Sequence, residues 1–357
     1  MLNCPPETHH LFPHFFALSE GYGSSDNLRK CLSNENEHVR LATILAISQF
    51  ERDDLLPDLK LLASQHDTPQ LEACLHALGS LHDDSAIDLL SSYTAHSSEN
   101  VSLTALMSLA SLDKKEALEE ISQRALQGNL FAISLLSDFP EQEKTLERLL
   151  FDHDSQVQLN AALGLLFQKN SKGLPIIMST LTDAPSLLLL PWHSPGKTVF
   201  ALKAFYHNPK QRNHPYAQQV SKHIKEKVLT AALQLPEKDF LVIVKAIVEA
   251  HQKELIPQAL SLLGSLKTDS AIEALKEFQR MPGAPLVRAW SNLLLYQLKE
   301  PGPWKESLIG WMRRDIMISS MGRNSERNII DVFVSFLMKY LRNKRPKKRL
   351  RLQMYFL

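Results

Sequence analysis

Apolar residues recur in the first third of the chain with a spacing of 31 residues. Segment 39–50 carries apolar side chains three and four residues apart, and the same pattern returns at 70–81 and 101–112. Corresponding positions are Ile44, Leu75 and Leu106; Ile47, Leu78 and Leu109; and Phe50, Leu81 and Leu112, with small residues at Ala46, Ala77 and Ser108. A repeat of this length accommodates two short helices, and such units bury their apolar faces by stacking. The pattern therefore predicts an all-α fold, a right-handed α-solenoid of stacked antiparallel helix pairs.

Capping and helix-breaking residues divide the repeats into individual helices. Pro57 suits the first turn of a second helix, where its missing N–H has no partner to lose, and Asp83 suits an N-cap. The first expected pair consists of helices at 37–50 and 54–64, and the second and third pairs span 69–94 and 99–127. The fourth consists of helices at 130–139 and 141–151, and the fifth runs from 157 to beyond 174. Short helices at 11–18 and 26–32 precede the first pair. The two short helices are expected to cover the open end of the first repeat.

The pattern is interrupted in the middle of the chain and then resumes. Five prolines between 184 and 215 exclude a long helix there. Segment 260–275 then matches 75–90 at 10 of 16 positions, which indicates an internal duplication. It predicts helices at 257–266 and 269–280, followed by a pair at 285–298 and 304–315.

These features give a predicted domain organisation. A segment at 328–341 is apolar on nearly all sides, which is typical of a buried helix or of one that meets a membrane surface, and we expect a cap. The predicted parts are a cap at 1–33, repeats at 34–183, a proline-rich interruption at 184–215, repeats at 216–315, a C-terminal cap helix at 316–341 and a basic tail at 342–357.

The fifth repeat carries the clearest family resemblance. Residues 157–166 read Val-Gln-Leu-Asn-Ala-Ala-Leu-Gly-Leu-Leu, with an aspartate before them and a second helix after them. This pattern resembles the HEAT-like repeats of armadillo-type proteins, and the short period is similar to the variety found in phycobilin lyase relatives. The Val-Arg pair of such repeats stands at 39–40 and 287–288 and is replaced elsewhere. The resemblance covers 34–183 and 237–315, and it implies a superhelical fold and no particular function.

Three enzyme hypotheses have less support than a binding role. Deoxyhypusine hydroxylases, built from similar helices, ligate iron through His-Glu pairs, but none of the 14 histidines here precedes a glutamate. Segment 194–198 is similar to the end of a phosphate-binding loop, but Pro191 stands where a glycine is needed and no strand precedes it. The resemblance to phycobilin lyase relatives supplies no catalytic residue. We therefore predict no enzymatic activity, catalytic residue, metal or cofactor; a lyase-like enzyme of unrecognised type is an alternative.

The net charge of +1 conceals a strongly basic C-terminus. From 304 to 357 the chain has 13 Lys and Arg against 4 Asp and Glu, so the preceding 303 residues carry −8. Seven of the ten residues at 342–351 are basic: Arg342, Lys344, Arg345, Lys347, Lys348, Arg349 and Arg351. Such a run binds phosphates or anionic lipid headgroups by charge, or is simply a solvated end of the chain.

The predicted function is a non-catalytic protein-binding scaffold or adaptor in the cytoplasm. The concave face would hold a segment of a partner protein, with Trp192 of the interruption as a candidate contact and no small-molecule substrate indicated. The alternative partner is an anionic membrane or a nucleic acid, bound by the basic tail. Cys4, Cys31 and Cys74 form neither a disulfide framework nor a zinc motif, which indicates a reducing compartment. We find no signal peptide or membrane-spanning run.

Overall fold

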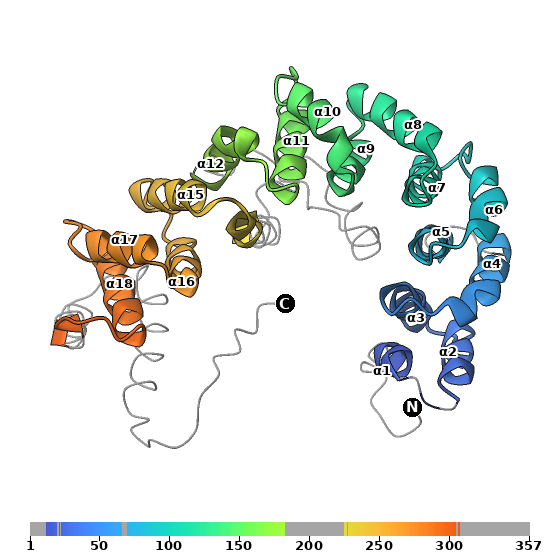
Figure 1. Cartoon of the computed structure of the whole chain (residues 1–357), viewed down its shortest axis with the longest axis horizontal. Helices are drawn as coiled ribbons and strands as arrows, with labels where there is room; N and C mark the ends of the chain where they lie inside the picture. Colours follow the sequence, from blue (N-terminus) through green and yellow to red (C-terminus); the bar gives the residue numbers. More distant parts are fainter. Residues whose placement is uncertain are drawn as a thin grey trace. The chain divides into compact units, whose positions relative to one another are not determined.

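A computed structural model describes residues 12–19, 21, 23–65, 70–182, 225–226, 228–304 and 306–307. Every regular element in this part of the chain is helical, which confirms the predicted all-α class (Figure 1). The chain divides into two compact units, Met1–Ile256 and Pro257–Leu357. The predicted interruption at 184–215, cap helix at 316–341 and basic tail at 342–357 lie outside the described residues.

The first unit contains short helices that agree closely with those predicted. Their bounds are α1 Phe12–Leu18, α2 Ser24–Leu32, α3 Glu37–Gln49, α4 Leu56–Gln65, α5 Gln70–Ser80, α6 Ile87–Ser92, α7 Glu99–Ser111, α8 Lys115–Leu126, α9 Leu130–Leu135, α10 Glu143–Leu149, α11 Ser155–Phe167, α12 Leu174–Thr182 and α15 Glu237–Glu249. Short 3₁₀ turns precede several of them: η2 Asp53–Leu55, η3 Asp84–Ala86, η5 Pro140–Gln142 and η6 Ser171–Gly173. The helix predicted at 130–139 is shorter, because it ends in a 3₁₀ turn, η4 Leu136–Asp138. We did not predict α15 as a separate element.

Side-chain caps fix where several helices begin. Asp83 Oδ1 accepts a hydrogen bond from the backbone N–H of Ser85 at 2.7 Å, which confirms the predicted cap. Asn36 caps α3 by accepting from the N–H of His38 at 2.9 Å, and Asp154 caps α11 by accepting from the N–H of Gln156 at 2.8 Å. These bonds satisfy N–H groups that the first helical turn leaves without a partner.

The helices of the first unit form two series. The A-series consists of α3, α5, α7, α9 and α11, and each member contacts the next one in the chain. The B-series consists of α4, α6, α8, α10 and α12; its first four members each pack on the A-series helix that follows (Figure 1). Helices α5 and α7 are consequently buried on nearly every side.

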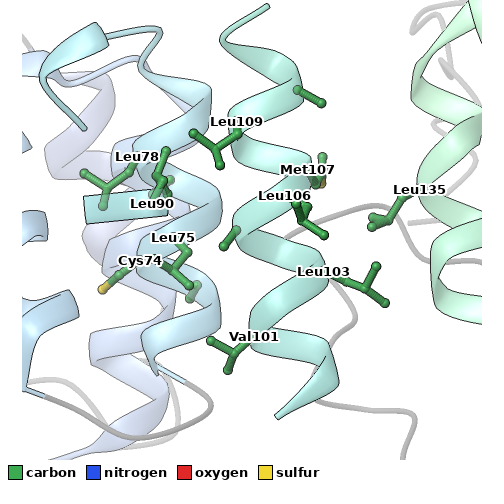
Figure 2. Close-up of a cluster of buried hydrophobic side chains, with 14 of the residues drawn as sticks. Cys74, Leu75, Leu78, Leu90, Val101, Leu103, Leu106, Met107, Leu109 and Leu135 are labelled. Atoms are coloured by element: carbon green, nitrogen blue, oxygen red, sulfur yellow. The ribbon is translucent and has the colours of Figure 1, made fainter. Parts of the chain in front are cut away.

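Leucines from both series form the core. Leu75 and Leu78 of α5 are fully buried, and Leu106 and Leu109 of α7 are each 5% exposed. Figure 2 shows Leu109 directed toward α5, and Leu103 directed toward Leu135 of α9. Ile44, Ile47 and Leu165, also predicted as core residues, are at most 1% exposed, so the predicted core positions are confirmed. Burial of each such side chain contributes about 1.5–3 kcal/mol before conformational entropy opposes it.

A glycine allows α5 and α7 to approach closely. A Cβ atom on Gly79 would lie 2.5 Å from Ser108 Cβ and 2.6 Å from Ser108 Cα. Ser108 Oγ donates a hydrogen bond to the carbonyl oxygen of Leu75 at 2.8 Å, so the two helices are joined by a polar contact at the same place. The close approach of α5 and α7 requires a small residue at both positions.

A left-handed residue ends most A-series helices. The non-glycine residues with positive φ are Glu51 (49°), His82 (52°), Asp113 (61°), Lys169 (63°), His251 (51°), Lys267 (56°) and Lys299 (62°). Each lies one or two residues beyond a helix end. In the first such turn the N–H of Arg52 donates back to the carbonyl of Ile47 at 3.0 Å, the Schellman pattern usually completed by glycine. A side chain there costs roughly 1–2 kcal/mol.

The second unit repeats this construction on a smaller scale. Its described helices are α16 Ile256–Leu266, α17 Asp269–Gln279 and α18 Pro285–Gln297, close to their predicted positions. Helix α17 packs on α18, and Leu275 and Leu295 are fully buried. Lys276 bridges Glu273 and Glu300 at 2.9 and 3.3 Å.

Candidate functional site

None of the residues that we predicted as partner contacts lies in the described part of the chain. Trp192 falls in the interruption, and the seven basic residues of 342–351 fall in the tail. The candidate site therefore has to lie on the described surface.

Polar contacts join most neighbouring members of the B-series, with α2 before them. They are Arg29 Nε to Asp58 Oδ2 (3.2 Å), Lys60 Nζ to the Ser85 carbonyl (2.7 Å), Ser122 Oγ to Gln142 Oε1 (2.6 Å) and Lys172 Nζ to Glu147 Oε1 (2.5 Å). Arg29–Asp58 joins α2 to α4, and Lys60–Ser85 joins α4 to η3. Ser122–Gln142 joins α8 to η5, and Lys172–Glu147 joins η6 to α10. Together they form a polar ladder along one side of the unit.

The ladder is interrupted between α6 and α8. Among the described residues, no side-chain hydrogen bond or ion pair joins these two helices. Helix α6 has six residues, whereas α4 has ten and α8 has twelve, so α6 ends early at Ser92. The Tyr93 hydroxyl then donates to the carbonyl of Ala63 at 2.8 Å, which holds the following segment against α4. The short α6 leaves a groove beside α8.

The groove has an apolar floor and a polar rim. Its volume is about 460 Å³, within the range of roughly 300–1,000 Å³ typical of binding pockets. Leu106 and Leu109 of α7 lie at the floor, with Ile87 of α6 and Ala117 of α8. The rim consists of Ser91, Thr94, Lys114, Glu116, Glu120 and Arg124. We call this feature the α6–α8 groove.

A second hollow lies on the other side of the Glu120–Arg124 pair. It has a volume of about 390 Å³ and shares those two residues with the α6–α8 groove. Its remaining lining residues are Glu99, Gln123, Gln127, Gly128 and Asn129. Asn129 Nδ2 donates to Glu99 Oε1 at 2.6 Å, so this hollow is lined almost entirely by polar groups.

Arg124 is held in place at the junction of the two hollows. Its Nε donates to Glu120 Oε1 at 2.9 Å, and its Nη1 donates to Ser102 Oγ at 3.0 Å. The Ser102 hydroxyl in turn donates to the carbonyl of Thr94. Because the guanidinium is fixed from two sides, it also fixes the carboxylate of Glu120 at the rim of the α6–α8 groove.

The groove lies in the most acidic part of the chain. Residues 34–182 contain 22 Asp and Glu against 10 Lys and Arg, a net charge of −12. Between 83 and 127 alone there are eight acidic and three basic residues. Many of the acids occupy the first turns of B-series helices, where they interact favourably with the helix dipole. The same placement puts these carboxylates on the B-series helices.

Two buried thiols and one histidine are poorly suited to catalysis. Burial raises the pKa of the Cys74 thiol to about 12 and also raises the pKa of Cys31, so both remain protonated and weakly nucleophilic. Desolvation lowers the pKa of His76 to about 4, which makes its imidazole a weak base.

His76 is expected to make the protein sensitive to acid. Its imidazole is neutral in the folded state down to about pH 4, whereas an unfolded chain takes up the proton near pH 6.5. Stability should therefore fall as pH decreases from about 6.5 to 4, by about 1–3 kcal/mol given the partial exposure of the ring. His76→Gln should remove this part of the pH dependence in urea unfolding curves. His38→Gln, at an exposed position, should leave the dependence unchanged.

No metal cluster, membrane-spanning helix or family match adds a site to the described residues. Within the described ranges, no cluster of three or more His, Cys, Asp or Glu could hold a metal ion. No helix there is long and apolar enough to cross a membrane. No protein-family model matches the chain, and no curated protein matches it in sequence.

The groove was missed by sequence reasoning, although the sequence contains a signal for the early end of α6. We treated 69–94 as one repeat and assigned no early end to its second helix. The serine- and threonine-rich segment 91–98, Ser-Ser-Tyr-Thr-Ala-His-Ser-Ser, favours a loop over a helix. This composition indicates the early end of α6 at Ser92 but not the groove beside it.

Proposed function

We propose that the protein is a non-catalytic binding scaffold, built as a HEAT-like α-solenoid, that holds a segment of a partner protein. The supporting observation is the order of contacts in the first unit: each A-series helix contacts the next, with core leucines at the same position of successive repeats. Arrays of this kind expose a long surface whose shape is set in advance, so a partner can be bound with few anchoring contacts. The concave face remains the proposed site of the main contact.

A second candidate function is peripheral attachment to an anionic membrane or nucleic acid. The observation in its favour is the separation of charge, because 34–182 carries −12 whereas 342–351 contains seven basic residues. Electrostatic attraction through the tail would be independent of sequence and sensitive to salt.

Partner capture with the full-length chain tests the scaffold proposal. A bound protein should co-purify in stoichiometric amount, and hydrogen exchange of the purified complex should be slowed in helices of 34–182. Leu78→Asp provides an unfolded control that should capture nothing specific. Partner binding with no protection anywhere in 34–182 would contradict the proposal.

Neutralising the tail is expected to separate the two functions. Replacing all seven basic residues of 342–351 with glutamine should leave the helical circular-dichroism signal and melting temperature unchanged, because a run of like charge contributes little to a core. It should abolish any binding to phosphatidylserine-containing vesicles or to duplex DNA. Where the unmodified chain binds these ligands, affinity should fall steeply from 50 to 200 mM salt, by about 10³-fold or more if six or more phosphates are contacted. Binding that persists in the neutralised variant would contradict the role of the tail.

A further inference from the structure

We propose that the exposed face of α1 is a docking surface for the same face of a second copy of this chain. The face consists of Phe15 and Leu18, which are 67% and 66% exposed, and we call it the α1 face. The inference concerns self-association and goes beyond the proposed partner binding. It is carried by the place of α1 beside the A-series, by apolar residues on opposite sides of α1, and by the lack of charge in that helix.

Helix α1 precedes α3 in the row that the A-series helices form. It packs on α2 and α3, and Figure 1 shows it next to α3 at the N-terminal end of this row. Further along the row, α5 has α3 and α7 as neighbours, and it is buried on nearly every side. Helix α1 is instead buried on one side and exposed on the other.

Both sides of α1 are apolar. Pro13 and Ala17, four residues apart, are buried on one side, whereas Phe15 and Leu18, three residues apart, lie on the opposite side. A helix that is apolar on all sides is normally buried on all sides. Two large apolar side chains that are each about two-thirds exposed and adjacent on one helix therefore mark a contact surface.

The chemistry of α1 favours a second copy over other occupants. In a twofold-symmetric contact both chains use the same patch, so a patch of like charges would repel itself. Segment 12–18 contains no Asp, Glu, Lys or Arg, so two such faces can meet without repulsion. A helix that lies on an anionic membrane surface usually has Lys and Arg beside its apolar face, and α1 has neither.

The area of the α1 face sets the strength of the contact. An aromatic side chain buries roughly 150–250 Å², and a standard interface between two proteins buries about 1,600 Å² in total. Phe15 and Leu18 from two copies supply only part of that area. We therefore expect a weak dimer that dissociates on dilution.

Sedimentation velocity of the full-length chain tests the inference. The unmodified chain is measured from about 1 µM, where a weak dimer dissociates, to about 500 µM. The average mass should rise from that of one chain toward that of two. Phe15→Lys with Leu18→Lys should weaken the association by about tenfold or more, because like charges then face each other across the twofold axis.

A variant of opposite charge tests the symmetry of the contact. Phe15→Glu with Leu18→Glu should also be monomeric alone, but an equal mixture of the glutamate and lysine variants should form a heterodimer. The matched control is Leu61→Lys with Leu126→Lys, which puts the same charges on exposed apolar positions of α4 and α8. It should change the association by less than about threefold. Melting temperatures equal to that of the unmodified chain show that the variants remain folded.

Four results would overturn the inference. A mass that stays at one chain throughout, with a lower melting temperature in the lysine variant, would mean that the α1 face is covered within the chain. A dimer that the lysine variant retains would place the contact elsewhere. Loss of the dimer in both charge variants without recovery in the mixture would mean that the α1 face meets a different surface.

The fourth contrary result concerns membranes. A monomeric chain that floats with phosphatidylserine-containing vesicles, and no longer does so in the glutamate variant, would assign the α1 face to a membrane. None of the four results bears on partner capture by 34–182, which tests the proposed function separately.

Discussion

Leu78→Asp is expected to unfold the array of the first unit. Leu78 is fully buried in α5, so the substitution removes a packed side chain and puts a carboxylate into a site without a cationic partner. The combined cost is about 5 kcal/mol or more, which is a large share of the stability of an ordinary domain. The helical circular-dichroism signal should fall at 25 °C, and the remaining signal should lose its cooperative melt.

The control for this change is Leu61→Asp in α4. Leu61 is 58% exposed, so the same chemical change at a solvated position should alter stability by less than about 1 kcal/mol. A melt of Leu78→Asp that is indistinguishable from the unmodified protein would show that the assigned register of α5 is wrong.

Gly79→Ala and Gly264→Ala are expected to change stability in opposite directions. The new methyl group at Gly79 would meet the Cβ and the backbone Cα of Ser108 at 2.5–2.6 Å, so α5 and α7 must separate. We expect a loss of about 2–3 kcal/mol, the cost typical of overpacking. At Gly264 in α16 the nearest atom is the side-chain methyl Leu294 Cδ2 at 3.2 Å, which can move. The helix propensity of alanine should there give a gain of up to about 1 kcal/mol.

Chemical denaturation of the two variants decides this prediction. Adding Ser108→Gly to Gly79→Ala removes the clash of the new methyl group with the serine side chain, but the clash with the backbone of residue 108 remains. The double variant should therefore recover only part of the lost stability, and it also loses the hydrogen bond to the Leu75 carbonyl. A Gly79→Ala protein as stable as the unmodified chain would show that the helices can separate without cost.

Helix positions were predictable because local signals agree with one another in this sequence. The apolar spacing, Pro57 and the Asp83 cap each depend on neighbouring residues, and all three place helix ends within a few residues of the structure. The predicted core was correct for the same reason, since Ile44, Leu75 and Leu106 occupy one position of a fixed pattern.

The groove was not predictable from these signals because it depends on what is missing between two helices. The early end of α6 forms a groove only because α7 and α8 supply its other walls. The packing of these three helices is not encoded by any local sequence pattern. The pair Glu120–Arg124 also looks like an ordinary i,i+4 salt bridge in the sequence. Its role at the junction of two hollows follows from Ser102, which is 22 positions away.

At the left-handed turns, residues of different charge adopt the same backbone conformation. Glutamate, histidine, aspartate and lysine occupy the same backbone conformation at Glu51, His82, Asp113 and Lys169. The geometry there comes from hydrogen bonds of the helix end and not from a particular side chain. The charge of each turn can therefore change by substitution, in evolution or by design, while the backbone conformation of the turn is retained. Substitutions in this row of turns can therefore change the charge of the surface without changing the shape of the turns.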